Sequence, residues 1–294
     1  MKITNKYNLP ETILNVLDRP AYSKGSAHIS VTEMLNSPRI VQLKRKYWEF
    51  IETDASEMVW ALFGTAVHNI LEHGKGDNHI VEQRIGTDIE GWRLSGAIDL
   101  QEVEGDEVTI KDYKVTGAWS VMNEKQDWHN QLNIYAYLVE KETGRKVKAL
   151  QIVAIVRDWA ARDTAKENYP QSPIVTIDIP LWDMEQRLQF IKERVHLHSS
   201  AYFESETEGN LPPCTPEEMW EKPTSYAVIK PGNVRAKSVH ATLEEAQHMV
   251  NQLKGYEIEV RPGERTRCAK YCQVSVFCEQ YKDRKSTRLN SSHI

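Results

Sequence analysis

The sequence contains no apolar run that could span a membrane, because no stretch of about 18 apolar residues occurs in it. Near its N-terminus it also lacks a basic stretch followed by an apolar one, which is the pattern of a secretory signal. From these two absences we expect a cytoplasmic protein that has no membrane partner.

An excess of basic residues is also missing, since 37 Lys and Arg stand against 42 Asp and Glu, for a formal net charge of -5. General attraction to polyanions is therefore not expected. Basic residues cluster only locally, at 39–46, 145–148 and 261–270. Each cluster alone is most simply a solvated face, so any contact with nucleic acid has to rely on such patches and on a bound cation.

Cysteine is absent from residues 1–213, and all four cysteines follow, at Cys214, Cys268, Cys272 and Cys278. In a cytoplasmic chain, closely spaced cysteines indicate metal or cluster ligation rather than disulfides. Four unligated core cysteines are the alternative, but the segment from Arg265 to Gln273 is too polar for a core.

Hydrophobic periodicity predicts an α/β fold in which a strand meander precedes a strand, helix, strand unit. The predicted helices cover 30–47 in two pieces, 56–72, 124–141 and 184–203, with a further helix starting at 242. The predicted strands cover 79–85, 92–100, 107–114, 149–156, 226–230 and 235–241.

Composition divides the chain into four predicted parts. Residues 1–55 form a helical lead-in, and residues 56–204 form the α/β core. An acidic, proline-bearing linker then opens a cysteine-containing appendix, residues 205–284. Residues 285–294 have no periodicity and little to bury, so we expect a disordered or foreign tail there.

The tripeptide Asp112-Tyr113-Lys114 places a carboxylate and an ammonium on one strand face, about 6.6 Å apart along the backbone. The carboxylate can hold a divalent cation, and the lysine can favour the deprotonated form of a water beside it, which suits phosphodiester hydrolysis. A surface ion pair is the simpler reading of the tripeptide taken alone.

Asp99 lies on the preceding predicted strand, beside small residues and amid apolar ones, and a buried acid needs a partner. Carboxylates on neighbouring strands repel each other unless a cation lies between them, and such oxygen ligands suit Mg²⁺ or Mn²⁺. An imidazole from His68, near the end of its predicted helix, would shift the preference towards Mn²⁺. Asp99 could instead cap a turn, and His68 could be an ordinary core or surface histidine.

The order of these motifs resembles the PD-(D/E)XK nuclease superfamily, and most closely its RecB-like branch. The motifs are Gly64-Thr65-Ala66-Val67-His68, Gly96-Ala97-Ile98-Asp99, Asp112-Tyr113-Lys114 and Gln131-Leu132-Asn133-Ile134-Tyr135. That branch includes nuclease domains of recombination helicases, iron-sulfur nucleases of CRISPR adaptation, and phage exonucleases. Ile98 stands where the superfamily name has proline, a departure that is common in this branch.

The resemblance implies a restriction-endonuclease-like core, a mixed β-sheet flanked by helices. It further implies that His68, Asp99 and Asp112 bind the metal and that Lys114 assists the attacking water. Gln131 and Tyr135 would position the site or the DNA strand, and Glu82 is a weaker candidate on an earlier strand.

The cysteine triplet is similar to that of the iron-sulfur members, with three residues in its first gap where those members usually have two. In those members the fourth cysteine precedes the nuclease core, whereas here the only candidate, Cys214, follows it. On this resemblance we expect a [4Fe-4S] cluster, although four thiolates also satisfy tetrahedral Zn²⁺.

The resulting hypothesis is a metal-dependent DNA nuclease, acting as an exonuclease in recombination, repair or phage DNA metabolism. No Gly-x-x-x-x-Gly-Lys-Ser/Thr loop occurs, so a helicase or recombination partner would be a separate chain. The alternatives are a catalytically silent DNA-binding or scaffold module with a four-cysteine metal site, and a zinc-ribbon interaction protein. The intact set of motifs argues against both.

Overall fold

The computed structural model describes residues 1–18, 24–123, 125–207 and 209–282, so the predicted tail at 285–294 lies outside the described residues. The chain forms two compact units, which are described separately below. The first contains Met1–Val41 and Glu49–Leu211, and the second contains Gln42–Trp48 and Pro212–Ile294. The boundary inferred from composition, between residues 204 and 205, stays a prediction about independent folding.

The first unit is built on a six-stranded sheet with the order β2-β5-β6-β7-β8, in which β4 pairs with β5. Strands β4, β5 and β6 form an antiparallel meander, β6 and β7 run parallel, and β8 returns antiparallel to β7. The strands are β2 (Ile29–Ser30), β4 (His79–Ile89), β5 (Trp92–Glu104), β6 (Glu107–Thr116), β7 (Lys146–Val156) and β8 (Ile174–Ile179). A separate parallel pair joins β1 (Lys2–Thr4) to β3 (Glu52–Asp54).

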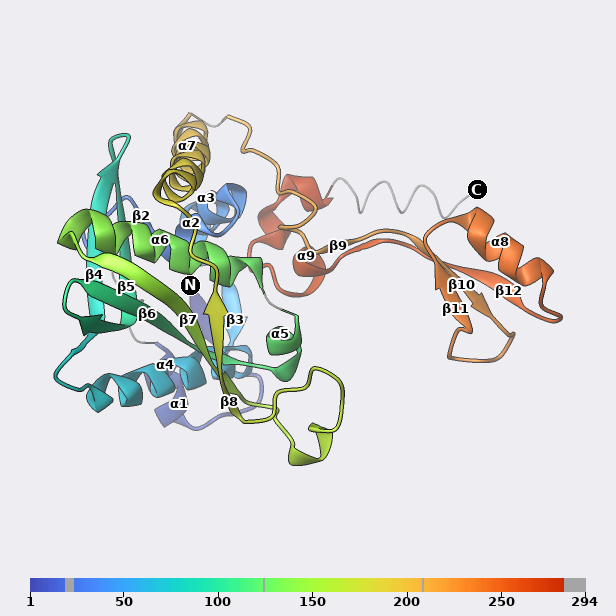
Figure 1. The fold of residues 1–294 in the computed structure, drawn as a ribbon. Helices are drawn as coiled ribbons and strands as arrows, with labels where there is room; N and C mark the ends of the chain where they lie inside the picture. Colours follow the sequence, from blue (N-terminus) through green and yellow to red (C-terminus); the bar gives the residue numbers. More distant parts are fainter. Residues whose placement is uncertain (19–23, 124, 208, 283–294) are drawn as a thin grey trace. The chain divides into compact units, whose positions relative to one another are not determined.

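Helices lie against this sheet, which makes the fold the mixed α/β class that the sequence predicts. In Figure 1, α6 and α7 lie on one side of the sheet strands and α4 on the other. The α-helices are α1 (Glu11–Leu17), α2 (Val31–Met34), α4 (Val59–Leu71), α5 (Ala118–Met122), α6 (Gln126–Thr143) and α7 (Met184–Glu206). Helix α3 (Pro38–Lys46) begins in the first unit, and its residues from Gln42 onwards belong to the second. Short 3₁₀ turns occur at η1 (Trp48–Phe50), η2 (Ala55–Met58), η3 (Glu72–Gly74) and η4 (Ala161–Asp163). None of the helices in the described part is long and apolar enough to cross a membrane.

Helix α6 is the centre of the core because it connects the two parallel strands and is buried along most of its length. Gly144 ends it in a left-handed conformation, with φ of 70°, which glycine adopts without steric cost. Glu140 near its end binds Arg187 of α7 at 2.8 Å, and both side chains are largely buried. This ion pair joins α6 to α7, and apolar contacts pack α6 against the sheet, which positions the residues that α6 points at β6.

The second unit has a small three-stranded sheet, β11-β10-β12, covered by α8. A two-stranded ribbon, β9 with β13, leads to α9 and the cysteine triplet. The elements are β9 (Glu221–Lys222), β10 (Ser225–Ile229), β11 (Ser238–His240), α8 (Leu243–Asn251), β12 (Glu257–Arg261), β13 (Glu264–Arg265), α9 (Thr266–Lys270) and η5 (Ser275–Phe277). Thr242 caps α8 through a capping box with Glu245, as the sequence predicts.

Candidate functional site

A cleft of about 970 Å³ lies in the first unit, where α2, α4 and α6 surround strands β4, β5 and β6. All six residues that the sequence analysis assigns to the site line this cleft, together with Glu82. The six are His68, Asp99, Asp112, Lys114, Gln131 and Tyr135. Fold topology therefore brings residues from 68 to 135 of the sequence to one place.

Three side chains in the cleft are arranged like a metal site. One ligand atom from each of His68, Glu82 and Asp99 lies within 4.8 Å of the other two. His68 Nδ1 is 3.5 Å from Asp99 Oδ1 and 3.6 Å from Glu82 Oε1. Two carboxylates and one imidazole at this spacing need only small rotations to reach the roughly 2.0 to 2.2 Å that Mg²⁺ or Mn²⁺ ligation requires.

The other ring nitrogen of His68 fixes how the imidazole can act. His68 Nε2 lies 3.1 Å from the carbonyl oxygen of Tyr113, the residue between Asp112 and Lys114. A carbonyl can only accept, so Nε2 carries the proton and Nδ1 presents a lone pair towards the two carboxylates. Metal-binding histidines are typically oriented by this kind of backbone hydrogen bond.

Glu82 reaches the site through an unusual backbone conformation. Its φ is 48°, and the β4 to β5 pairing, which joins Val81 to Leu100 and Gln83 to Ile98, does not include Glu82. A left-handed conformation in a residue with a Cβ costs about 1 to 2 kcal/mol. Such strain tends to occur at functional sites, and here it turns the Glu82 carboxylate towards His68.

Asp99 is buried, and its environment disfavours the charged form of its carboxyl group. Its Oδ2 accepts a hydrogen bond of 2.8 Å from the backbone N–H of Tyr113. Burial, and then the nearby charge of Asp112, raise the pKa of Asp99 to about 8. A divalent cation beside Asp99 would offset both effects, so the electrostatics of the cleft fit a bound metal.

Asp112 occupies the same cleft but is not one of the three residues grouped within 4.8 Å. Its Oδ2 forms a 2.5 Å ion pair with Lys114 Nζ, and its Oδ1 accepts a 3.0 Å hydrogen bond from Gln131 Nε2. The same amide nitrogen of Gln131 lies 3.0 Å from the hydroxyl oxygen of Tyr135. The sequence analysis expected Asp112 as a third metal ligand, and this stays a prediction; in the structure its carboxylate contacts Lys114 and Gln131.

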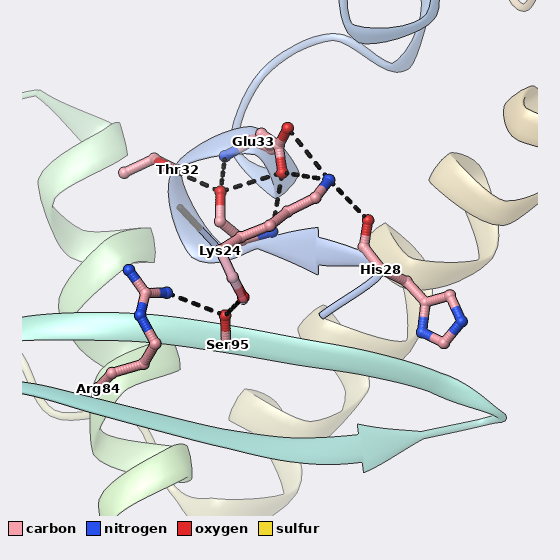
Figure 2. Close-up of polar contacts among 7 residues, drawn as sticks. Lys24, His28, Thr32, Glu33, Arg84 and Ser95 are labelled. Atoms are coloured by element: carbon pink, nitrogen blue, oxygen red, sulfur yellow. Dashed lines mark hydrogen bonds and ion pairs between the residues drawn. The ribbon is translucent and has the colours of Figure 1, made fainter. Parts of the chain in front are cut away.

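Lys24 and Arg84 line another part of the cleft (Figure 2). The Lys24 ammonium lies 3.1 Å from the Glu33 carboxylate and donates to the backbone oxygen of His28 at 2.9 Å. Arg84 Nη1 donates to Ser95 Oγ at 3.1 Å. The sequence analysis did not assign either of these basic side chains to the site, although Arg84 stands two positions after Glu82 on the same strand.

The four cysteines lie in the second unit as free thiols, of which Cys214 and Cys278 are buried. Gln280 holds Cys214 in place, because its side chain binds both the backbone N–H and the carbonyl of Cys214, at 2.8 and 2.9 Å. Burial raises the pKa of Cys268 to about 11, and the charges of Cys272, Cys214 and Cys278 contribute further. The other three thiols are therefore within electrostatic range of Cys268.

The spacing of these sulfur atoms bears on which metal they fit. Among the described residues, no three cysteines have sulfur atoms all within 4.8 Å of one another. Four thiolates on one Zn²⁺, at about 2.3 Å each, would be closer together than that. A cubane cluster is several ångströms across and holds its thiolates farther apart.

Comparison with known proteins identifies one family. The model of the PD-(D/E)XK nuclease superfamily matches residues 74–279. The crystal structure of SSO0001 has a TM-score of 0.45 and 19% identity, covering 64% of this chain and 85% of that one. The protein described as "Putative exonuclease" from Eubacterium rectale has a TM-score of 0.32 and 14% identity, covering 69% and 75%. No curated protein matches the chain.

Proposed function

Because the chain belongs to the PD-(D/E)XK nuclease superfamily, we propose that its cleft is the active site of a metal-dependent deoxyribonuclease. The observation that carries the proposal is the convergence of His68, Glu82 and Asp99 beside the Asp112–Lys114 ion pair. A metal ion at the three ligands could polarise the phosphate and generate a hydroxide nucleophile, and the neighbouring lysine adds a positive charge beside it.

We assign the cation, Mg²⁺ or Mn²⁺, to His68, Glu82 and Asp99. Asp112 lines the same cleft beside these three ligands. When bound, the cation would lower the pKa of a water molecule and neutralise charge on the phosphate. Lys114 would favour the deprotonated form of the attacking water. Gln131, itself in contact with Tyr135, would hold the Asp112 carboxylate in place, so Gln131 and Tyr135 are positioning residues.

We further propose that the enzyme is an exonuclease, which attacks DNA from a strand end in recombination, repair or phage DNA metabolism. This proposal rests on the resemblance of the motifs to the RecB-like branch. A helicase or recombination protein, if one cooperates with this nuclease, would be a separate chain.

For the second unit we propose a [4Fe-4S] cluster held by Cys214, Cys268, Cys272 and Cys278, with Zn²⁺ as the alternative. The residues fit such a group because the other three thiols lie in electrostatic range of Cys268, and two of the four are buried without a disulfide. The cluster would stabilise this unit and take no part in cleavage.

The test is incubation of the purified protein with end-labelled single-stranded and duplex DNA, in Mg²⁺, in Mn²⁺ and in EDTA. We expect the label to be released as short products with either metal and to remain on full-length DNA in EDTA. If the protein binds DNA but leaves it intact with both metals, it is the catalytically silent module and the proposal is wrong.

A further inference from the structure

Helix α4 is strongly apolar and yet contains no buried residue. Its sequence from Val59 to Leu71 is VWALFGTAVHNIL, which periodicity alone would place against a core. Four of its large hydrophobic side chains are exposed, namely Val59, Trp60, Phe63 and Ile70. Exposed apolar side chains gathered on one element indicate a binding surface.

One row of this helix runs along the cleft and past its end. Gly64 and His68 line the cleft and are four residues apart, so they lie on one side of the helix. Trp60 is the next residue of this row towards the N-terminus, about 12 Å from His68 along the helix axis. A Cβ built at Gly64 would meet nothing within 4 Å, so the row is open between Trp60 and His68.

A cation lies against Trp60. The guanidinium carbon of Arg157 is 4.3 Å from the centre of the Trp60 ring. Arg157 directly follows β7, and its backbone N–H donates to the oxygen of Thr116 at the end of β6, the strand that carries Asp112 and Lys114. In the described part of the chain, no carboxylate pairs with this guanidinium.

We propose that Trp60 and Arg157 form a subsite for an unpaired nucleotide of the substrate strand, with the base stacked on the face of Trp60 that Arg157 does not cover and a phosphate beside Arg157. The inference rests on the proposed nuclease function, because the strand is placed by its passage through the cleft to the metal group. Stacking on an aromatic side chain beside a cation is how proteins bind single strands irrespective of sequence. A base within a duplex is already stacked and paired, so this subsite selects single-stranded DNA.

The test measures binding and cleavage separately. A single-stranded oligonucleotide containing 2-aminopurine is titrated in EDTA, where its fluorescence reports both stacking and affinity without cleavage. We expect Trp60→Ala to raise Kd about tenfold and to abolish the stacking signal, and Trp60→Phe to restore part of both. In Mg²⁺, Trp60→Ala should raise KM for single-stranded DNA by a similar factor while changing kcat little.

Phe203→Ala is the matched control, because Phe203 is an exposed aromatic residue of the first unit on a different helix, α7, and does not line the cleft. It should bind as the wild type does. Trp60→Ala binding with wild-type affinity, or losing affinity for blunt duplex and single strand equally, would overturn the subsite.

A second copy of the chain on α4 is the competing occupant, and light scattering separates the two. A wild-type dimer that Trp60→Ala converts to a monomer would refute the nucleotide subsite. Wild-type protein that neither binds nor cleaves DNA refutes the nuclease proposal itself. Wild-type cleavage that Trp60→Ala leaves unchanged in KM refutes only the subsite.

Discussion

Asp112→Asn is expected to reduce kcat for DNA cleavage by about 10³-fold, because it removes a charge used in the transition state. Lys114→Met should have an effect of the same size, because it removes the ammonium group that pairs with Asp112. Neither change should unfold the protein. An asparagine at 112 keeps the oxygen that accepts from Gln131, and it removes the repulsion between Asp112 and Asp99.

The matched control is Lys111→Met, on the same strand as Lys114. Lys111 forms an ion pair with Glu102 at 2.8 Å and does not line the cleft. We expect this variant to cleave end-labelled DNA as fast as the wild type. Initial rates in saturating Mn²⁺ and a thermal melting curve of each variant complete the measurement. Wild-type turnover by pure Asp112→Asn or Lys114→Met protein would show that the assignment of the site is wrong.

The second large effect concerns the cysteines. Cys272→Ser is expected to remove the visible absorption of anaerobically purified protein and to make the chain beyond about Leu211 sensitive to protease. The reason is that this unit has strands of only two to five residues and a small core around Ala227, Val228 and Ala246. Such a core does not offset chain entropy by itself, so ligation has to supply much of the folding free energy.

Ser275→Ala is the control for this experiment, since it changes one small side chain in the same segment and leaves all four thiols. It should keep both the absorption and the protease resistance. The first unit should survive in Cys272→Ser, with kcat for cleavage little changed and DNA binding weakened. Colourless wild-type protein with one zinc per chain would show that the cysteines bind zinc and not a cluster. Loss of the entire fold in Cys272→Ser would show that the second unit does not fold separately.

Local sequence signals were sufficient for most of the first unit's elements. Alternation of apolar residues predicts β4, β5 and β6, and the structure extends each of them at its C-terminal end, β5 as far as Glu104. The reason for the longer β5 is that its last residues continue to pair with β6, as Val103 does with Val108. Such pairing depends on a partner strand and is invisible in a single segment.

Other features depend on long-range geometry, so the sequence predicted them only in part. The sequence predicted helix α4 but not its exposure to solvent, because periodicity does not reveal whether another element covers an apolar stripe. The sequence analysis ranked Glu82 below Asp112 as a ligand, whereas the structure groups Glu82 with His68 and Asp99. Nothing in the local sequence signals the positive φ that turns Glu82 into the cleft.

The most direct test of the central claim is to locate the metal. Crystals soaked in Mn²⁺ are measured at a wavelength where manganese scatters anomalously, and the anomalous difference map is compared with the positions of His68, Glu82 and Asp99. The account predicts a peak between these three side chains, close to Asp112. Mn²⁺ that supports cleavage but gives its peak elsewhere, with this position empty, would contradict the account.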